Sequence, residues 1–350
     1  MKCDENAAAT RSEYLLVVTP DMDSSADFVE EATSEIVHDF PHMIRVYKDG
    51  TVQRFLGTAT VPPGLDSRTG IESKDVTISD HVSARLYLLP NLNEQKKSKI
   101  PLLVYFHGGG FCIESAASPT YHNHLNLLAS QAGLVVVSVE YRRAPEHPLP
   151  AAFDDSWAAL QWVQSHAVLA GEEPWLMSHV DFSRVFLGGD SAGATIAHHV
   201  GIKAGVEGLV GIRLDGIILV HPFFDGEEVI PGEKKMTTGS ALWRLICPES
   251  KAGLDDPWIN PALDPNLKLM ATERLLVMVA EKDFLRARGL LYKETVANSG
   301  WQGHLQLVET EGQGHVFHLL NPNTDAAATL LDQLVLFINH HPPLSSACPS

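Results

Sequence analysis

The sequence has few cysteines, no long apolar run and no basic run, and each shortage excludes a class of protein. Its four cysteines, Cys3, Cys112, Cys247 and Cys348, are scattered, so we expect reduced thiols in the cytoplasm rather than a disulfide framework. No apolar stretch approaches the roughly 18 residues of a membrane-spanning helix. The sequence lacks an Asn-x-Ser/Thr acceptor, and its acidic first residues contradict a secretory or transit peptide. These absences predict a soluble cytoplasmic protein.

Positive charge is also scarce. The chain has 26 Lys and Arg against 43 Asp and Glu, a formal net charge of −17, and no basic run exceeds two residues. Nucleic acids and anionic membranes bind basic surfaces, so neither is expected as a partner. With 45% apolar and 20% charged residues, the chain can bury a large core. Because an acidic surface slows the approach of anions, we expect a neutral or weakly charged small-molecule partner.

Strand-length apolar runs alternate with helix-length segments from about residue 100 onward. The expected strands are residues 102–106, 135–139, 185–187, 217–220 and 275–279, and the expected helices are residues 120–131, 153–165, 192–204, 286–299 and 326–338. This alternation predicts the α/β class, with a mostly parallel central sheet flanked by helices and ligands bound beyond the carboxyl ends of the strands. Upstream, apolar residues alternate on both sides of Asp49-Gly50, which predicts a hairpin.

We interpret residues 35–340 as a single domain. Residues 1–34 are polar and acidic and are expected to be a disordered leader, with residues 341–350 as a tail. The turn-rich insert 222–266 contains no strand pattern, and inserts of this length usually serve function. Together with residues 35–60, it is expected to form a helical cap over the site.

The nucleophile candidate is Ser191, in the pattern Gly189-x-Ser191-x-Gly193 between an expected strand and an expected helix. A strand-to-helix turn this sharp admits only glycine beside the serine and pushes the hydroxyl out over the sheet. The Ala192 N–H, at the start of the helix, is free to bind developing negative charge. The pattern is weak alone, so its context has to support it.

That context begins with the strand that ends in His107-Gly108-Gly109-Gly110. Successive glycines let backbone N–H groups approach an anionic oxygen that side chains would otherwise block. A flexible glycine-rich turn would explain the glycines but not their position after a strand. We therefore expect Gly108, Gly109 and Ala192 to form an oxyanion hole.

The general base and the orienting acid are sought at other strand ends. His315 lies in a glycine-rich loop after a strand-like run, whereas its rival His318 falls in the next turn of helix. Asp283 follows an apolar strand in the chain order Ser, acid, His, with Glu281 as the alternative acid. Asp190 is interpreted as an acceptor that stabilises the loop. The remaining histidines lack metal-ligand spacing, so no metal is expected.

The segments His107 to Gly110, Tyr141 to Pro148 and Gly189 to Gly193 resemble the hormone-sensitive-lipase branch of the α/β-hydrolase fold. The chain is most similar to plant carboxylesterases, a group that includes 2-hydroxyisoflavanone dehydratases and the gibberellin receptor. The resemblance runs from about residue 36 to residue 338. It implies Ser191 as nucleophile, His315 as base and acid, Asp283 as orienting acid, and no cofactor.

The resemblance predicts a carboxylesterase that hydrolyses a small neutral ester, or a related plant metabolite, through an acyl-enzyme. The alternative is a lyase, dehydratase or cyclase that uses the same oxyanion hole and histidine base. A non-catalytic receptor is less favoured, because the family's receptor lacks the histidine that is present here as His315. Five aromatic residues either line a substrate pocket or fill the core: Phe111, Phe223, Phe224, Trp243 and Trp258.

Overall fold

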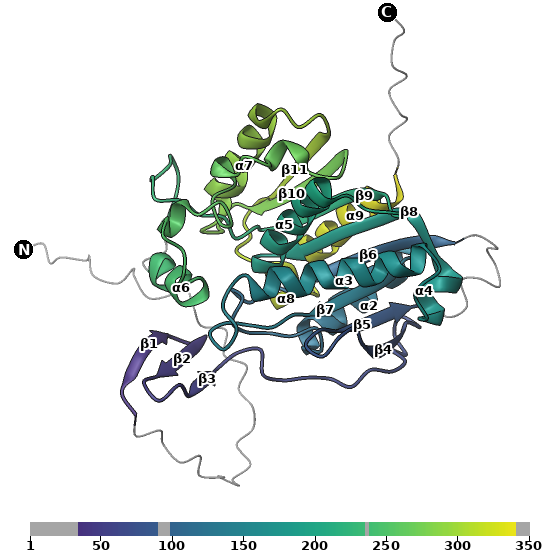
Figure 1. The fold of residues 1–350 in the computed structure, drawn as a ribbon, viewed down its shortest axis with the longest axis horizontal. Coiled ribbons are helices and arrows are strands. Elements are labelled where there is room, and N and C mark those ends of the chain that lie inside the picture. Colours follow the sequence, from purple (N-terminus) through teal and green to yellow (C-terminus); the bar gives the residue numbers. More distant parts are fainter. Residues whose placement is uncertain (1–33, 90–98, 235–237, 341–350) are drawn as a thin grey trace, which may run out of the picture.

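The computed structural model describes residues 34–89, 99–234 and 238–340, so the leader and tail predicted for residues 1–34 and 341–350 lie outside it, apart from Ser34. Figure 1 shows a central sheet covered by helices, with a small separate sheet at one end. Every helix among the described residues is too short or too polar to span a bilayer.

The central sheet has eight strands in the order β11-β10-β9-β8-β6-β7-β5-β4. Neighbours from β11 to β7 are parallel, whereas β5 and β4 pair antiparallel at one edge. The strands are β4 (Glu72–Thr77), β5 (Ser83–Leu88), β6 (Ile100–Phe106), β7 (Val135–Glu140), β8 (Val180–Asp190), β9 (Leu214–Val220), β10 (Arg274–Ala280) and β11 (His304–Thr310). The strands predicted from the apolar runs are confirmed.

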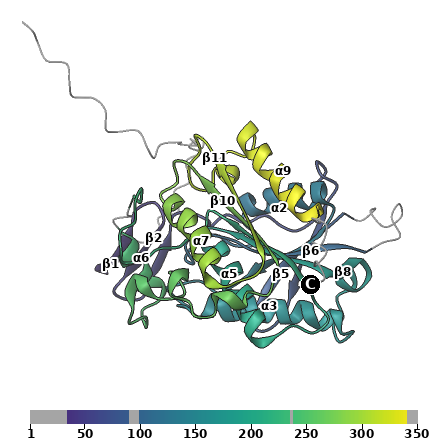
Figure 2. The same cartoon turned by 90° about the horizontal axis from the view of Figure 1, so that it is seen from above.

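Helices cover both faces of this sheet, as Figure 2 shows. One core layer lies under α3, α5 and α7, and the other under α2, α8 and α9. The helices are α2 (Pro119–Ala132), α3 (Ala151–Ala167), α4 (Pro174–His179), α5 (Ala192–Glu207), α6 (Gly239–Ile246), α7 (Arg286–Ser299), α8 (Phe317–Leu320) and α9 (Asp325–Asn339). The predicted α/β class is therefore confirmed.

Burial on both faces explains why the inner strands are continuous apolar runs. Val135, Val136 and Val137 of β7 are fully buried, although successive side chains point to opposite faces. Their β-branched side chains also favour extended backbone. A parallel sheet covered on both sides requires such continuous apolar runs, and these runs allowed the strands to be predicted from the sequence.

The prediction of helical structure for the first part of the cap, residues 35–60, is wrong. Residues 36–54 form a three-stranded antiparallel sheet of β1 (Ile36–Phe40), β2 (Ile44–Tyr47) and β3 (Val52–Arg54). The burial of Ile44 and Val46 on either side of the half-buried Arg45 has the two-residue period of a strand, not the period of a helix. The Asp49-Gly50 hairpin is confirmed, with Gly50 at φ 89°.

In the second part of the expected cap, the described residues 222–234 and 238–266 contain α6 and two 3₁₀ turns, η1 (Gly253–Asp255) and η2 (Pro261–Leu263). Both views place α6 beside the N-terminal sheet. Met43, in the β1–β2 turn, and Leu242 of α6 are both near Gly110: a Cβ on Gly110 would lie 2.7 Å from Met43 Cε and 3.8 Å from Leu242 Cδ2. Segments far apart in sequence thus meet at the glycine loop.

Candidate active site

Ser191 lies in a strained turn between β8 and α5. Its backbone has φ 51° and ψ −118°, a region that residues other than glycine seldom adopt. A Cβ on Gly189 would lie 2.4 Å from the Gly193 carbonyl carbon, and one on Gly193 would lie 2.0 Å from the Phe106 carbonyl oxygen. Both glycines are needed because β6 and the start of α5 pack backbone against backbone. Ser191 is 9% exposed.

The structure brings Ser191, His315 and Asp283 together from the carboxyl ends of β8, β11 and β10. His315 Nε2 lies 3.0 Å from Ser191 Oγ, and His315 Nδ1 lies 2.8 Å from Asp283 Oδ2. The other Asp283 oxygen accepts the Leu285 N–H at 2.9 Å. Burial raises the pKa of Asp283, but the charge and hydrogen bond of His315 outweigh it, and the net effect is a lowered pKa. An ionised Asp283 holds the Nδ1 proton and leaves the Nε2 lone pair facing Ser191.

The rival residues lie elsewhere. His318 is 3% exposed and contacts the His124 and His221 rings in the interior. Glu281 Oε2 accepts the Gly312 N–H at 2.7 Å, so it holds the loop that leads to the candidate base.

Sequence reasoning missed His221, which follows β9. Its Nδ1 accepts the Val316 N–H at 3.0 Å, and both residues have left-handed backbone, at φ 48° and 45°. The His221 ring lies 5.9 Å from the His315 ring, centroid to centroid. The hydrogen bond from the Val316 N–H to His221 holds the residue that follows His315. Its one sequence signal was its position just past a predicted strand, which it shares with the other site residues.

Among the described residues, one trio has ligand atoms close enough for a metal ion: those of His221, Asp283 and His315 lie within 4.8 Å of one another. A metal there would have to replace the Nδ1 proton that His315 donates to Asp283. The hydrogen bonds of His315 to Asp283 and Ser191 therefore compete with metal binding at this trio.

The glycine loop departs from expectation at one position. The Gly108 N–H donates to Tyr121 Oη at 2.8 Å, so the prediction of Gly108 as an oxyanion donor needs correction. Gly109 and Gly110 have φ 89° and 58°, conformations that favour glycine. Within the described part of the chain, no hydrogen bond engages the N–H of either residue or that of Ala192. These three N–H groups are the available donors.

Asp190, beside the nucleophile, is an acceptor, in accord with its interpretation from sequence. Its two oxygens accept the hydroxyl protons of Tyr105 at 2.8 Å and Tyr121 at 2.9 Å. Burial raises its pKa from 3.8 to about 6, although both tyrosine hydrogen bonds lower it. The His315 charge lowers the pKa of Asp190 slightly, but among the described residues no hydrogen bond joins the two side chains, so Asp190 lies outside the hydrogen-bonded series of Ser191, His315 and Asp283.

The five aromatic candidates lie mostly in the core. Phe111, Phe223, Phe224 and Trp243 are at most 4% exposed, and Trp258 is half-buried. Phe111 packs on Phe153 and Phe223, with ring centroids 5.9 and 6.5 Å apart. Their role in binding substrate stays a prediction.

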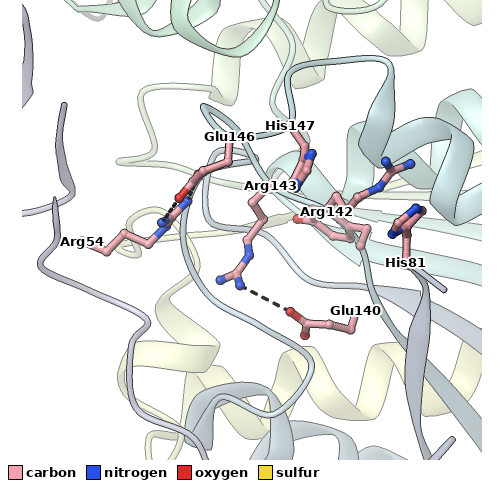
Figure 3. A pocket seen from close by; sticks show the side chains of 8 residues that line it. Arg54, His81, Glu140, Arg142, Arg143, Glu146 and His147 are labelled. Atoms are coloured by element: carbon pink, nitrogen blue, oxygen red, sulfur yellow. Dashed lines mark hydrogen bonds and ion pairs between the residues drawn. The ribbon is translucent and has the colours of Figure 1, made fainter. Parts of the chain in front are cut away.

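A separate pocket of about 290 Å³ opens beside the N-terminal sheet and contains none of the predicted site residues (Figure 3). In it, Arg54 of β3 forms an ion pair with Glu146 at 2.6 Å and donates to the Cys112 carbonyl at 2.7 Å. The pocket's other two guanidinium groups also have carboxylate partners, so its charges are paired internally. The contacts of Arg54 with Cys112 and Glu146 fix the N-terminal sheet to the segments after the glycine loop. Its lining residues are Arg54, His81, Glu140, Tyr141, Arg142, Arg143, Glu146 and His147.

Comparison with known proteins agrees with the observed fold. A family model described as alpha/beta hydrolase fold matches residues 103–319. A probable carboxylesterase of Arabidopsis thaliana is 46% identical, over 87% of this chain and 98% of that protein. A 2-hydroxyisoflavanone dehydratase of Glycyrrhiza echinata is 43% identical, over 87% and 97%. A solved esterase of Pyrobaculum calidifontis superposes with a TM-score of 0.63 at 26% identity, over 76% and 84%.

Some relatives at 42% and 44% identity are named as mitochondrial or chloroplastic enzymes. The cytoplasmic location expected from the sequence therefore stays a prediction.

Proposed function

Because this chain belongs to the α/β-hydrolase family that includes plant carboxylesterases and 2-hydroxyisoflavanone dehydratases, we propose that it hydrolyses small neutral carboxylic esters through Ser191. The observation that carries the proposal is the hydrogen-bonded series from Ser191 Oγ through His315 to Asp283. Nucleophile, base and orienting acid within hydrogen-bond distance are what acyl transfer requires.

In the proposed reaction, His315 Nε2 takes the Ser191 proton as Oγ attacks the ester carbonyl carbon. The carbonyl oxygen becomes an oxyanion, which the N–H groups of Gly109, Gly110 and Ala192 bind. His315 then donates its proton to the leaving alcohol, and an acyl-serine remains. Water attacks that acyl group with His315 again as base, which releases the acid and restores Ser191. Asp283 stabilises the imidazolium in both halves.

The side chains around the glycine loop support a neutral substrate. Met43 and Leu242 approach it from the N-terminal sheet and from α6, and both are apolar. We interpret these two segments as the cap over the site. An apolar cover disfavours a charged acyl group, because burying an unpaired charge is costly.

The test is steady-state hydrolysis of p-nitrophenyl acetate by wild type and by Ser191→Ala, with stoichiometric labelling of Ser191 by an organophosphate. We expect turnover and labelling in wild type and neither in the variant. A folded wild type that neither hydrolyses short-chain esters nor takes up the organophosphate would refute the proposal.

A second candidate, elimination of water from a hydroxyketone, is favoured by the 43% identity to a dehydratase. There the oxyanion hole would polarise a ketone and His315 would remove an α-proton, without an acyl-enzyme. Ser191→Ala separates the two reactions: a dehydratase keeps much of its activity on its own substrate, whereas an esterase loses it.

A further inference from the structure

Two hydrogen bonds connect the nucleophile turn to the glycine loop through the buried side chain of Tyr121. The Gly108 N–H donates to Tyr121 Oη at 2.8 Å, and Tyr121 Oη donates to Asp190 Oδ2 at 2.9 Å. Asp190 is the residue before Ser191. Tyr121, on α2, and Asp190 are 3% and 1% exposed. The series therefore runs from one half of the proposed oxyanion hole to the other without passing through solvent.

We propose that Tyr121 is a positioning residue for the reaction: its hydroxyl fixes the distance between the glycine loop and the Ser191 turn. This inference rests on the proposed esterase function. Tyr121 touches no reacting atom. It acts through Gly108, whose neighbours Gly109 and Gly110 supply N–H donors, and through Asp190, whose neighbour Ser191 supplies the nucleophile.

The directions of the two hydrogen bonds at the Tyr121 hydroxyl support this role. A hydroxyl both accepts and donates, so Tyr121 satisfies a backbone N–H on one side and a carboxylate on the other. Hydrogen bonds to a carboxylate are shorter and stronger than neutral ones, and in a buried site they constrain geometry tightly. There is also no room for a side chain at position 108, because a Cβ on Gly108 would lie 2.5 Å from Asp190 Oδ2. The close approach of the loop to Asp190 thus requires glycine at position 108.

Tyr105 provides a matched comparison within the same network. It donates to the other Asp190 oxygen at 2.8 Å and is also 3% exposed, but no hydrogen bond among the described residues links its hydroxyl to the glycine loop. Removing either hydroxyl takes one hydrogen bond from the same carboxylate. Of these two hydroxyls, only that of Tyr121 also accepts the Gly108 N–H. A difference between the two variants therefore reports on the loop and not on Asp190.

Loss of the Tyr121 hydroxyl should be partial in effect, because a second anchor remains. Tyr141 Oη donates to the His107 carbonyl at 2.7 Å and to the Gly108 carbonyl at 3.1 Å. Losing one oxyanion donor costs about 10²–10³ in rate, and a 1 Å displacement of a catalytic group costs about 10². For a loop displaced but still anchored, we expect a fall in kcat of roughly 10- to 100-fold.

The experiment compares Tyr121→Phe with Tyr105→Phe in the full chain, by kcat and KM for p-nitrophenyl acetate and by the Ki of a trifluoromethyl ketone. The ketone adds Ser191 Oγ to its carbonyl carbon and places an oxyanion in the hole, so its Ki reports the donors directly. For Tyr121→Phe we expect kcat to fall and Ki to rise by similar factors, with KM within about threefold. For Tyr105→Phe we expect both values within about threefold of wild type.

Equal effects in the two variants, or wild-type kcat and Ki in Tyr121→Phe, would overturn the inference. Circular dichroism and thermal unfolding establish that each variant folds. If Tyr121→Phe does not fold, Asp190→Asn decides: coupled changes in kcat and Ki support the inference, and unchanged values overturn it. Failure of the proposed function looks different, since wild type itself would then show no turnover that depends on Ser191.

Discussion

Replacement of His221 tests how the loop carrying the proposed base is held. The Val316 N–H donates to His221 Nδ1 at 3.0 Å, and Val316 directly follows His315. Val316 is β-branched and has φ 45°, a left-handed conformation that costs roughly 1–2 kcal/mol for an L-residue. The hydrogen bond offsets that cost. Without it, the loop can relax and carry the imidazole away from Ser191.

The magnitude follows from the burial of the bond. The Val316 N–H is partly buried, so leaving it without an acceptor costs about 1–2 kcal/mol. A loop destabilised by that amount relative to a relaxed state loses up to about 5- to 30-fold in the population of the competent conformation. We therefore expect kcat of His221→Ala to fall by roughly 5- to 30-fold.

The matched control is His221→Asn, because the Asn Oδ1 lies about where the imidazole Nδ1 was and can accept the same N–H. We expect its kcat within about threefold of wild type, measured with p-nitrophenyl acetate and checked by the rate of organophosphate labelling. Both variants lose most of the ring, so a pure packing effect would reduce them equally. Equal loss in both, or no loss in His221→Ala, would refute the reasoning.

Three further predictions concern the same region. Asp283→Asn should lower kcat by about 10⁴, because an amide leaves the imidazole in the wrong tautomer; esterase kinetics at saturating ester measure it. Gly193→Ala should cost about 3 kcal/mol in thermal unfolding, since its Cβ would lie 2.0 Å from a backbone oxygen, whereas Gly314→Ala, with open space, should not. Burial raises the pKa of Asp190 from 3.8 to about 6, so the folded protein retains a proton that the unfolded chain has lost. The unfolding free energy of wild type minus that of Asp190→Asn should then fall by about 2 kcal/mol from pH 4 to pH 7, measured by urea titration.

Residues whose geometry is set locally were the ones that sequence reasoning located. Ser191 is flanked by glycines that a sharp turn demands, and Asp283 and His315 follow apolar strands whose ends lie at one edge of a parallel sheet. The structure places their side chains within hydrogen-bond distance of one another. Their catalytic roles stay a proposal until the variants are measured.

Two sequence expectations failed for different reasons. The residues before Gly57 were expected to form part of a helical cap but form β1, β2 and β3, because their buried residues recur with the two-residue period of a strand. Gly108 was expected to donate to the oxyanion, but its N–H donates to Tyr121. No local sequence pattern predicts this hydrogen bond, because the Tyr121 hydroxyl reaches Gly108 only once α2 has packed against β6.

By itself, the sequence determined the α/β class, the order of the strands along the chain and the places where chemistry lies. It could do so because apolar runs buried on both faces and glycine-demanding turns are local features. Only the tertiary structure decided which N–H groups of the glycine loop are free, that His221 holds the His315 loop, and that Tyr121 and Asp190 join the loop to the nucleophile turn. These contacts join segments up to 95 residues apart, and their geometry depends on how helices pack against the sheet, which no local pattern encodes.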